Sequence, residues 1–322
     1  MSDLKDKAFK LKDLIDSANS IALSSHVSVD GDNLGSSLAL YIALKNMGKE
    51  VIIYKSDEIP NAYNFLPSID EFAIWNDLVS HDLYISLDCG DLERLGKNKE
   101  LFTIAKNKVV IDHHKTNPGY GDLNIIEFEK SSTCELLFEL FMLMDFNITP
   151  NMATALFSGI STDTGRFLYS NTSPRTFEIA KILLEYGADK DTAYLNLFMN
   201  RPRRKLEVLK IGLEKAEFID DFLAISTILK EDLKSSGASI HELDEIGDFL
   251  RDTEGIEVAA LIKEADDGIY KISLRSKEYL NVGSVAYDLG GGGHIKAAGA
   301  TMKGNLDEVK EKLINRILNE RN

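Results

Sequence analysis

Hydrophobic and polar positions along the chain follow patterns that predict a strand, a helix and a second strand in succession. Residues 4–15 have apolar side chains at helical spacing and should form an amphipathic helix outside the first strand. The apolar run at 21–23 predicts a strand, 35–47 predicts a helix closed by Gly48, and 51–54 predicts another strand. This order is typical of a βαβ unit.

The same alternation continues through the first 190 residues. Apolar strands that end in polar residues are expected at 82–91, 109–115 and 123–127. Helices are expected at 133–144, 151–160 and 174–186. These elements predict an α/β fold with a parallel sheet and helices on both faces.

The pattern changes after a polar, basic segment that ends in NRPRRK. We therefore expect a first domain over residues 1–189, a linker over 190–205 and a second domain over 206–322. The second domain should be a smaller α/β unit across a cleft from the first. Its expected strands are 222–228, 258–263 and 269–275, and its expected helices are 240–253 and 306–318.

Composition narrows the classes of protein that fit this organisation. The chain has 322 residues, 44% of them hydrophobic, and a formal net charge of −15, which disfavours binding to long nucleic acid. Its first residues lack a signal peptide's apolar core, and no apolar run reaches bilayer length, so we expect a cytoplasmic protein without membrane contact. Cys89 and Cys134 lack metal-finger spacing and should be reduced core residues. A small phosphorylated ligand remains compatible with this acidity.

Candidate chemistry gathers where the predicted strands end. His26, Asp30 and Asp32 follow the first strand, Asp88 follows the strand in 82–91, and Asp112, His113 and His114 end the strand in 109–115. Asp163 follows the helix at 151–160 and adds a further carboxylate. Because ligands bind outside the carboxyl ends of parallel strands, these groups should converge there, and carboxylates with imidazoles suit divalent cations.

Each of these features also has a structural explanation. The Asp30–Gly31–Asp32 sequence could form a simple turn, and Asp88 could cap the next helix. The paired histidines 113 and 114 could be ordinary polar residues at a strand end. The occurrence of four such groups at four successive element ends favours a metal site.

The second domain contains a glycine run, LGGGGHIKAAGA, at residues 289–300. Consecutive glycines allow backbone amides to approach a ligand, although a glycine run alone is more often a flexible loop. Arg275 ends a predicted strand and could bind a phosphate or carboxylate through two hydrogen bonds.

Five motifs, in order, resemble those of a known superfamily. HVSVDGD, LDCGD, DHH and STDTG resemble the four motifs of the DHH phosphoesterase superfamily, and GGGGHIKAAG resembles the signature of its DHH-associated C-terminal domain. The resemblance covers essentially the whole chain. The chain's length is similar to that of the stand-alone bacterial group that combines oligoribonuclease and phosphoadenosine phosphate phosphatase activities.

The resemblance implies a site for two divalent ions, usually Mn²⁺, with Mg²⁺ or another divalent ion as a substitute. Asp88 would bridge the two ions, and Asp112 would orient the histidines. His114 would face the scissile phosphate and assist the leaving oxygen. By motif position, the metal ligands would be His26, Asp30 and Asp88 for one ion and Asp32, Asp88, His113 and Asp163 for the other.

The resemblance also implies substrate-binding residues. Those implied in the second domain are Arg275, Ser276, Gly291, Gly292, Gly293 and His294. The chain departs from many relatives at Val29 and Asn33 around the DGD motif, and at Arg166, which could add a phosphate contact. These departures affect the expected substrate preference rather than the metal ligands.

The resulting functional expectation is hydrolysis of very short RNA to nucleoside monophosphates and of 3′-phosphoadenosine 5′-phosphate (pAp) to AMP. Two alternatives remain open: a phosphodiesterase for cyclic di-AMP or its product pApA, and a catalytically inactive nucleotide-binding protein. Apolar surface on residues 133–144 or on the linker could support a homodimer.

Overall fold

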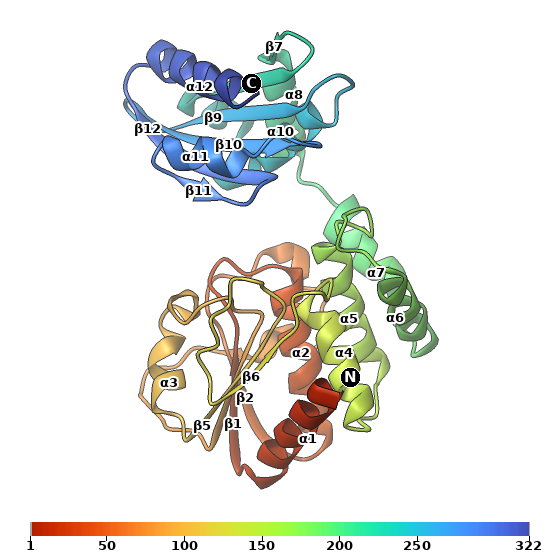
Figure 1. Ribbon diagram of the computed structural model, residues 1–322. Helices are drawn as coiled ribbons and strands as arrows, with labels where there is room; N and C mark the ends of the chain where they lie inside the picture. Colours follow the sequence, from red (N-terminus) through yellow and green to blue (C-terminus); the bar gives the residue numbers. More distant parts are fainter. Residues whose placement is uncertain (1, 322) are drawn as a thin grey trace. The chain divides into compact units, whose positions relative to one another are not determined.

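The computed structural model describes residues 2–321, which form two compact units (Figure 1). The first unit extends to Asn200 and the second begins at Arg201. The segment around this boundary is mostly helical, with α7 (Lys190–Tyr194), the π-helix η4 (Leu195–Met199) and α8 (Arg203–Glu214). Among the described residues, no helix combines the length and apolarity needed to cross a bilayer.

The first unit is built on six parallel strands in the order β3-β2-β1-β4-β5-β6, which confirms the predicted parallel α/β sheet. The order runs in opposite directions from β1 and from β4, so the topological switch point lies between these two strands. Ligands bind at such points in open α/β sheets. The strands are β1 (Ser20–Ser24), β2 (Glu50–Tyr54), β3 (Phe72–Ala73), β4 (Leu83–Leu87), β5 (Asn107–Asp112) and β6 (Leu123–Ile126).

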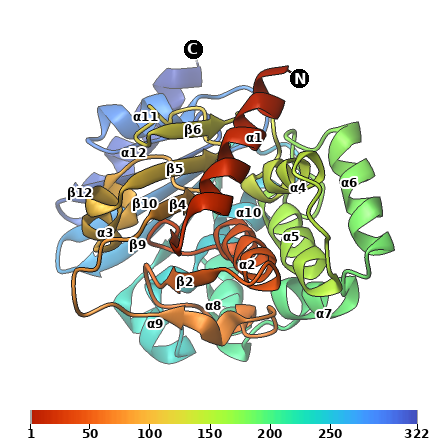
Figure 2. The same cartoon turned by 90° about the horizontal axis from the view of Figure 1, so that it is seen from below.

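Helices cover both faces of this sheet (Figures 1 and 2). Alternation along the strands explains this, because Ile21 and Leu23 pack on one side while Ala22 and Tyr84 pack on the other. On the first side lie α1 (Ser2–Ser17), α2 (Gly31–Asn46), α4 (Thr133–Leu143) and α5 (Pro150–Asp163), with α6 (Pro174–Glu185) packed outside α5, and on the other side lies α3 (Asn98–Ile104). Short 3₁₀ turns occur at η1 (Asn61–Tyr63), η2 (Ile69–Glu71) and η3 (Glu93–Leu95).

Helix α2 begins earlier than the sequence pattern predicted. Asp30 is its N-cap and accepts a hydrogen bond from the amide of Asn33, so Asp32 lies in the first helical turn and not in a loop. Gly35, predicted as the helix start, lies inside the helix. A Cβ there would come within 2.5 Å of the Ala155 carbonyl oxygen, so glycine permits the close packing of α2 against α5.

The expected apolar surface on residues 133–144 is largely buried, whereas the expected linker exposes Leu195 and Met199, and a homodimer stays a prediction. Helix α4 is apolar on nearly all sides, and such a helix is buried in a core. Its side chains lie in the main core of the first unit, and Met142 is the exposed exception among its large apolar residues, with 49% of its surface accessible.

The second unit contains a mixed six-stranded sheet in the order β11-β12-β10-β9-β8-β7. Its strands are β7 (Glu217–Ile219), β8 (Leu223–Ile228), β9 (Val258–Asp266), β10 (Ile269–Ser276), β11 (Gly292–Gly293) and β12 (Ala297–Lys303). Helices α8 and α10 (Asp244–Arg251) pack on one face, and α11 (Val282–Asp288) and α12 (Leu306–Arg321) on the other. Helix α9 (Lys230–Ser236) and the turn η5 (Ile240–Glu242) complete the unit.

The glycine-rich stretch is not the open loop that the sequence suggested. Gly292 and Gly293 form strand β11, which pairs with β12 through Gly299 and Ala298. Helix α11 and strand β12 were both missed, because their alanines and glycines give no clear apolar period.

Candidate metal centre and active site

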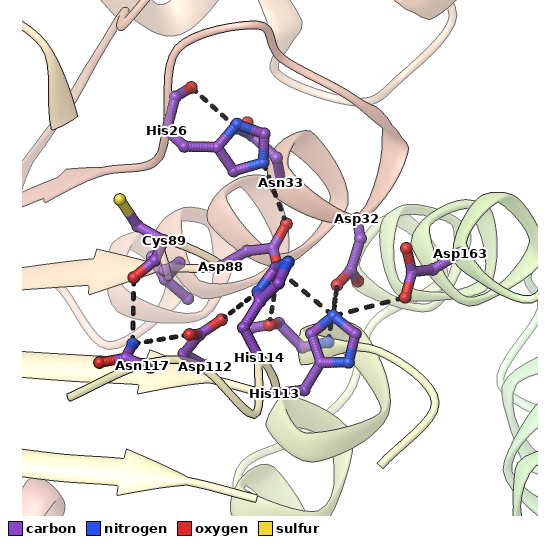
Figure 3. A network of polar contacts seen from close by, with 12 residues as sticks. His26, Asp32, Asn33, Asp88, Cys89, Asp112, His113, His114, Asn117 and Asp163 are labelled. Carbon is purple, nitrogen blue, oxygen red and sulfur yellow. Dashed lines mark hydrogen bonds and ion pairs between the residues drawn. The ribbon is translucent and has the colours of Figure 1, made fainter. Parts of the chain in front are cut away.

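The predicted acidic and histidine residues of the first unit lie together at the carboxyl ends of β1, β4 and β5 (Figure 3). The amino end of α2 and the carboxyl end of α5 meet them there. Three groups have donor atoms that all lie within 4.8 Å of one another: His26, Asp30 and Asp88; Asp32, His113 and Asp163; and Asp88, His113 and His114. Residues distant in sequence therefore converge at the switch point.

The first group surrounds the imidazole of His26. Its Nε2 atom lies 3.4 Å from Oδ2 of Asp88 and 3.6 Å from Oδ2 of Asp30. Its Nδ1 lies 2.7 Å from the carbonyl oxygen of Val27, and donation of the Nδ1 proton to that oxygen leaves the Nε2 lone pair for a metal. Nη2 of Arg94 lies 3.1 Å from the same Nδ1.

The second group surrounds His113. Its Nε2 lies 3.4 Å from Oδ2 of Asp163, 3.7 Å from Oδ1 of Asp88 and 4.0 Å from Oδ2 of Asp32. The two carboxylate oxygens of Asp88 therefore face different groups, Oδ2 toward His26 and Oδ1 toward His113. This is the arrangement expected of a carboxylate shared between two cations.

Asp88 is held firmly in this central position. It follows β4 directly, its φ angle of 51° is left-handed, and 2% of its surface is accessible. Its amide donates to the carbonyl of Ile111, and the Thr133 hydroxyl donates to its Oδ1 at 3.0 Å. Left-handed conformations of non-glycine residues store strain that often accompanies a functional site.

The carboxylates of the site repel one another in the absence of cations. Burial and then the nearby Asp88 raise the pKa of Asp163 to about 8, and the same two causes raise the pKa of Asp32 well above its usual value. Within residues 2–321, no lysine or arginine forms an ion pair with Asp30, Asp32, Asp88 or Asp163. Divalent cations would relieve this repulsion, so the donor set fits a divalent metal.

At His26, a bound proton supplies the positive charge that a metal cation would supply. Burial alone would lower the pKa of this imidazole, but its contacts with Asp30 and Asp88 outweigh burial and raise the pKa to about 10. Metal binding at this position would therefore release a proton.

A carboxylate and an imidazole form a dyad beside the metal ligands. Oδ1 of Asp112 accepts a hydrogen bond from Nδ1 of His114 at 2.8 Å. This hydrogen bond is the main cause that raises the pKa of His114 to about 9. Asn117 donates from Nδ2 to Oδ2 of Asp112 at 2.6 Å and to the Cys89 carbonyl at 3.1 Å, which fixes the carboxylate (Figure 3).

Several supporting residues were missed by the sequence analysis. The amides of Thr133 and Cys134, at the amino end of α4, donate to the two carboxylate oxygens of Asp32 at 2.6 and 2.8 Å. Ser132 and Glu135 in the sequence signal a helix start there, but no local pattern shows that this start lies against Asp32. Asn117 and Arg94 had no sequence signal either.

The other polar or reactive residues near the strand ends are not part of the groups of metal-type donors. Asp91 is exposed, and its Oδ1 accepts a hydrogen bond from the amide of Arg94 in the turn η3. Arg166 has a φ of 66°, and its guanidinium lies over the ring of Phe198, 5.5 Å from the centroid. A substrate contact by Arg166 stays a prediction. Cys89 is a buried cysteine that forms no disulfide, and burial raises the pKa of its thiol to about 11.

The predicted substrate residues of the second unit lie around the end of β10. The Ser276 hydroxyl and amide donate to the carbonyls of Ile295 and Lys296, which places Ser276 beside the exposed turn that carries His294. Nε of Arg275 lies 3.7 Å from Asp248. The amide of Gly291 already donates to the Ala286 carbonyl, so the predicted role of a free amide does not fit this residue. A ligand role for Arg275, Ser276, Gly292, Gly293 and His294 stays a prediction.

Comparison with known proteins relates the whole chain to one family. Residues 20–160 match the model of the DHH family, N-terminal domain, and residues 220–320 match the DHHA1 domain. The bifunctional oligoribonuclease and PAP phosphatase NrnA of Thermus thermophilus is 34% identical over 93% of this chain and 90% of its own length. NrnA of Bacillus subtilis is 28% identical over 88% and 90%, respectively.

A solved structure extends the likeness to the fold. The exopolyphosphatase-related protein of Bacteroides fragilis superimposes with a TM-score of 0.90 at 24% sequence identity, over 98% of both chains. The matched domains, the identity to NrnA over nearly the whole length and the shared fold lead to one conclusion: the chain belongs to the DHH family.

Proposed function

We propose that this protein is a metal-dependent phosphoesterase that hydrolyses very short oligoribonucleotides to nucleoside monophosphates and pAp to AMP. The observation that supports this most directly is the position of Asp88 between two separate groups of metal-type donors. The names of the NrnA relatives agree with these substrates. The cyclic di-AMP alternative is not favoured by relatives that match over nine-tenths of their own length.

We propose two divalent ions, with Mn²⁺ as the preferred metal. His26, Asp30 and Asp88 would hold one, and Asp32, Asp88, His113 and Asp163 the other. Bound ions would supply positive charge to the phosphoryl oxygens and lower the pKa of a water.

The protein's own groups then have distinct tasks. Asp112 fixes the ring of His114 through Nδ1, which leaves Nε2 to face the substrate and to donate a proton to the leaving oxygen as a general acid. Thr133 and the amino end of α4 hold Asp88 and Asp32 in place, so these carboxylates need little reorganisation when cations bind. Arg275, Ser276 and His294 of the second unit are the proposed contacts to the remainder of the nucleotide.

Short substrates suit the charge of the chain. A net charge of −15 opposes the binding of a long polyanion, whereas a short nucleotide meets mainly the local charges of the site.

A comparison of substrates tests the proposal. Initial rates would be measured with pAp, with diribonucleotides to pentaribonucleotides, with a long RNA and with cyclic di-AMP, each with Mn²⁺, with Mg²⁺ and with a chelator. We expect turnover of pAp and short RNA that requires the metal and falls with RNA length. Faster cleavage of cyclic di-AMP than of the short RNAs would refute the proposed substrate class, and binding without turnover would support an inactive nucleotide-binding protein.

A further inference from the structure

Two lysines of the second unit face each other across neighbouring strands. In the antiparallel pair of β9 and β10, Lys271 lies directly opposite Lys263. Side chains of directly opposed residues on one sheet face lie about 5 Å apart at Cβ, and like charges in that position destabilise a sheet. The chain has 52 acidic and 37 basic residues, so acidic partners are more numerous than the basic residues that need them, and two opposed lysines are unexpected.

Neither lysine has a close carboxylate partner. The nearest acid to Lys263 is Asp244, whose Oδ1 lies 3.9 Å from Nζ, and within residues 2–321 Lys271 forms no ion pair. The side chain of Lys263 is only 11% exposed. Burial lowers the pKa of Lys263, Asp244 partly opposes this, and the neighbouring Arg275 and Lys271 lower the pKa further.

The surface beside the lysines forms a groove, and many of the residues that line it are small. Lys263, Lys271, Ser273 and Thr301 line a groove of about 330 Å³ together with backbone of Gly290, Gly291 and Gly299. The register explains the shape, because Lys271 also lies opposite Thr301 and Ser273 lies opposite Gly299. A Cβ on Gly291 would come within 2.1 Å of the Gly299 carbonyl oxygen. A larger residue would therefore not fit at this edge of the groove.

The remaining charged groups on this face leave it positive. Alternation along β10 places Arg275 on the same face as Lys271. Helix α10 contributes Asp244 and Asp248, which lie 3.9 Å from Lys263 and 3.7 Å from Arg275. Asp244 is at the outer limit of ion pairing, and Asp248 also forms a closer ion pair with Arg251 at 3.1 Å, so the carboxylates are fewer than the cations near them. The face therefore has an uncompensated positive charge.

We propose that this groove, which we call the lysine groove, binds a phosphate group of a nucleotide. Lys263 and Lys271 would donate charge-assisted hydrogen bonds to its oxygens. The Ser273 and Thr301 hydroxyls line the same groove and could donate as well. The assignment to a nucleotide substrate rests on the proposed function, whereas the anion site itself rests on the groove.

An ordinary solvated surface explains the two lysines less well. Lys271 is exposed, as lysines normally are, but the side chain of Lys263 is largely buried on the same sheet face beside it. Such an arrangement costs stability in the free protein, as is common where side chains are placed for a ligand.

Binding measured without metal tests the lysine groove directly. The full-length protein in excess chelator would be titrated with AMP and with adenosine by calorimetry, and the ratio of the two affinities reports the phosphate contact. We expect the wild type to prefer AMP and Lys271→Gln to reduce that preference about tenfold. Lys312→Gln, on the exposed side of α12, removes the same charge from the same unit and should leave the preference unchanged.

A second variant distinguishes the loss of a phosphate contact from a loss of folding. Lys263→Met removes the more buried ammonium and should also reduce the AMP preference, while both lysine variants should unfold at the same temperature as the wild type or higher. An AMP preference in Lys271→Gln within twofold of the wild type would overturn the proposal. Failure of the wild type to hydrolyse pAp, with an AMP preference that still depends on Lys271, would refute the proposed function and leave the lysine groove standing.

Discussion

Replacement of Asp88 by asparagine should weaken the binding of both metal ions about a thousandfold without harming the fold. Asparagine has nearly the same shape as aspartate and tolerates the left-handed φ of 51° found at this position. It can also keep an oxygen facing the Thr133 hydroxyl, which lies 3.0 Å from Oδ1. Alanine would add backbone strain and would be a less informative variant.

The expected loss of metal affinity follows from the negative charge that Asp88 would offer to each ion. The Asp88 oxygens lie 3.4 and 3.7 Å from the ligand nitrogens of His26 and His113. Two unit charges about 4 Å apart interact by about 4 kcal/mol at an effective dielectric constant of about 20, and a dication doubles this. If the amide and solvent recover half of the lost energy, about 4 kcal/mol per ion remains, which is about a thousandfold weaker binding.

Two measurements would follow the variant. Mn²⁺ titration would give the number of bound ions and their affinities, and thermal unfolding with and without Mn²⁺ would give the stabilisation by metal. The wild type should gain about 2.7 kcal/mol per bound ion at an ion concentration of about 100 times the dissociation constant, and Asp88→Asn should gain almost nothing. Asp77→Asn, an exposed change of equal charge, is the matched control and should behave as the wild type.

The stability of the variant without metal separates a ligand role from a structural one. Asp88 contributes to the raised pKa of both Asp32 and Asp163, so its neutralisation removes repulsion. The same change removes the attraction between Asp88 and the protonated His26, so metal-free Asp88→Asn should differ little in stability from the metal-free wild type. Unchanged metal stoichiometry in Asp88→Asn, or a metal-free variant that is clearly less stable, would refute the shared-ligand arrangement.

Three further predictions address the surroundings of the site. Asn117→Ala removes the 2.6 Å hydrogen bond to Asp112 and should lower kcat about tenfold at unchanged KM in steady-state assays. Gly159→Ala puts a Cβ 2.3 Å from Cys134 Sγ and 3.0 Å from Asp32 Cα, and should cost about 1–3 kcal/mol in urea unfolding, whereas Gly292→Ala meets open space. In chelator, the folded chain keeps the Asp163 proton up to about pH 8 and the unfolded chain loses it near pH 3.8, so stability should fall as the pH rises between these values. Asp163→Asn should flatten that pH dependence, and an equally steep curve would contradict the assigned cause.

The sequence was sufficient to predict the residues that converge in the first unit. Parallel strands bring their carboxyl ends to one edge, so strand assignment alone brings His26, Asp88 and His113 together, as the structure shows. Element bounds were less accurate. Asp30 is an N-cap and Asp32 lies in the helix, because hydrogen bonding at a helix start depends on side-chain geometry that the apolar pattern does not contain.

The supporting contacts could not be predicted for a different reason. Thr133 bonds to Asp88 across 45 residues, and the Cys134 amide bonds to Asp32 across 102. Likewise, the opposition of Lys263 and Lys271 depends on the register of β9 and β10. The apolar pattern specifies the face of each strand, but it does not show the irregularity between Ile269 and Tyr270 that shifts this register.

The charges left unsatisfied within each unit indicate what the protein binds. In the first unit, buried carboxylates crowd together without a lysine or arginine partner among the described residues, and protons on Asp163 and His26 partly compensate. In the second, two lysines face each other with one distant acid. Cations relieve the first arrangement and an anion relieves the second. A metal-dependent enzyme that binds a phosphate group of a nucleotide would satisfy both, and neither arrangement is explained by stability alone, because each costs free energy in the unliganded protein.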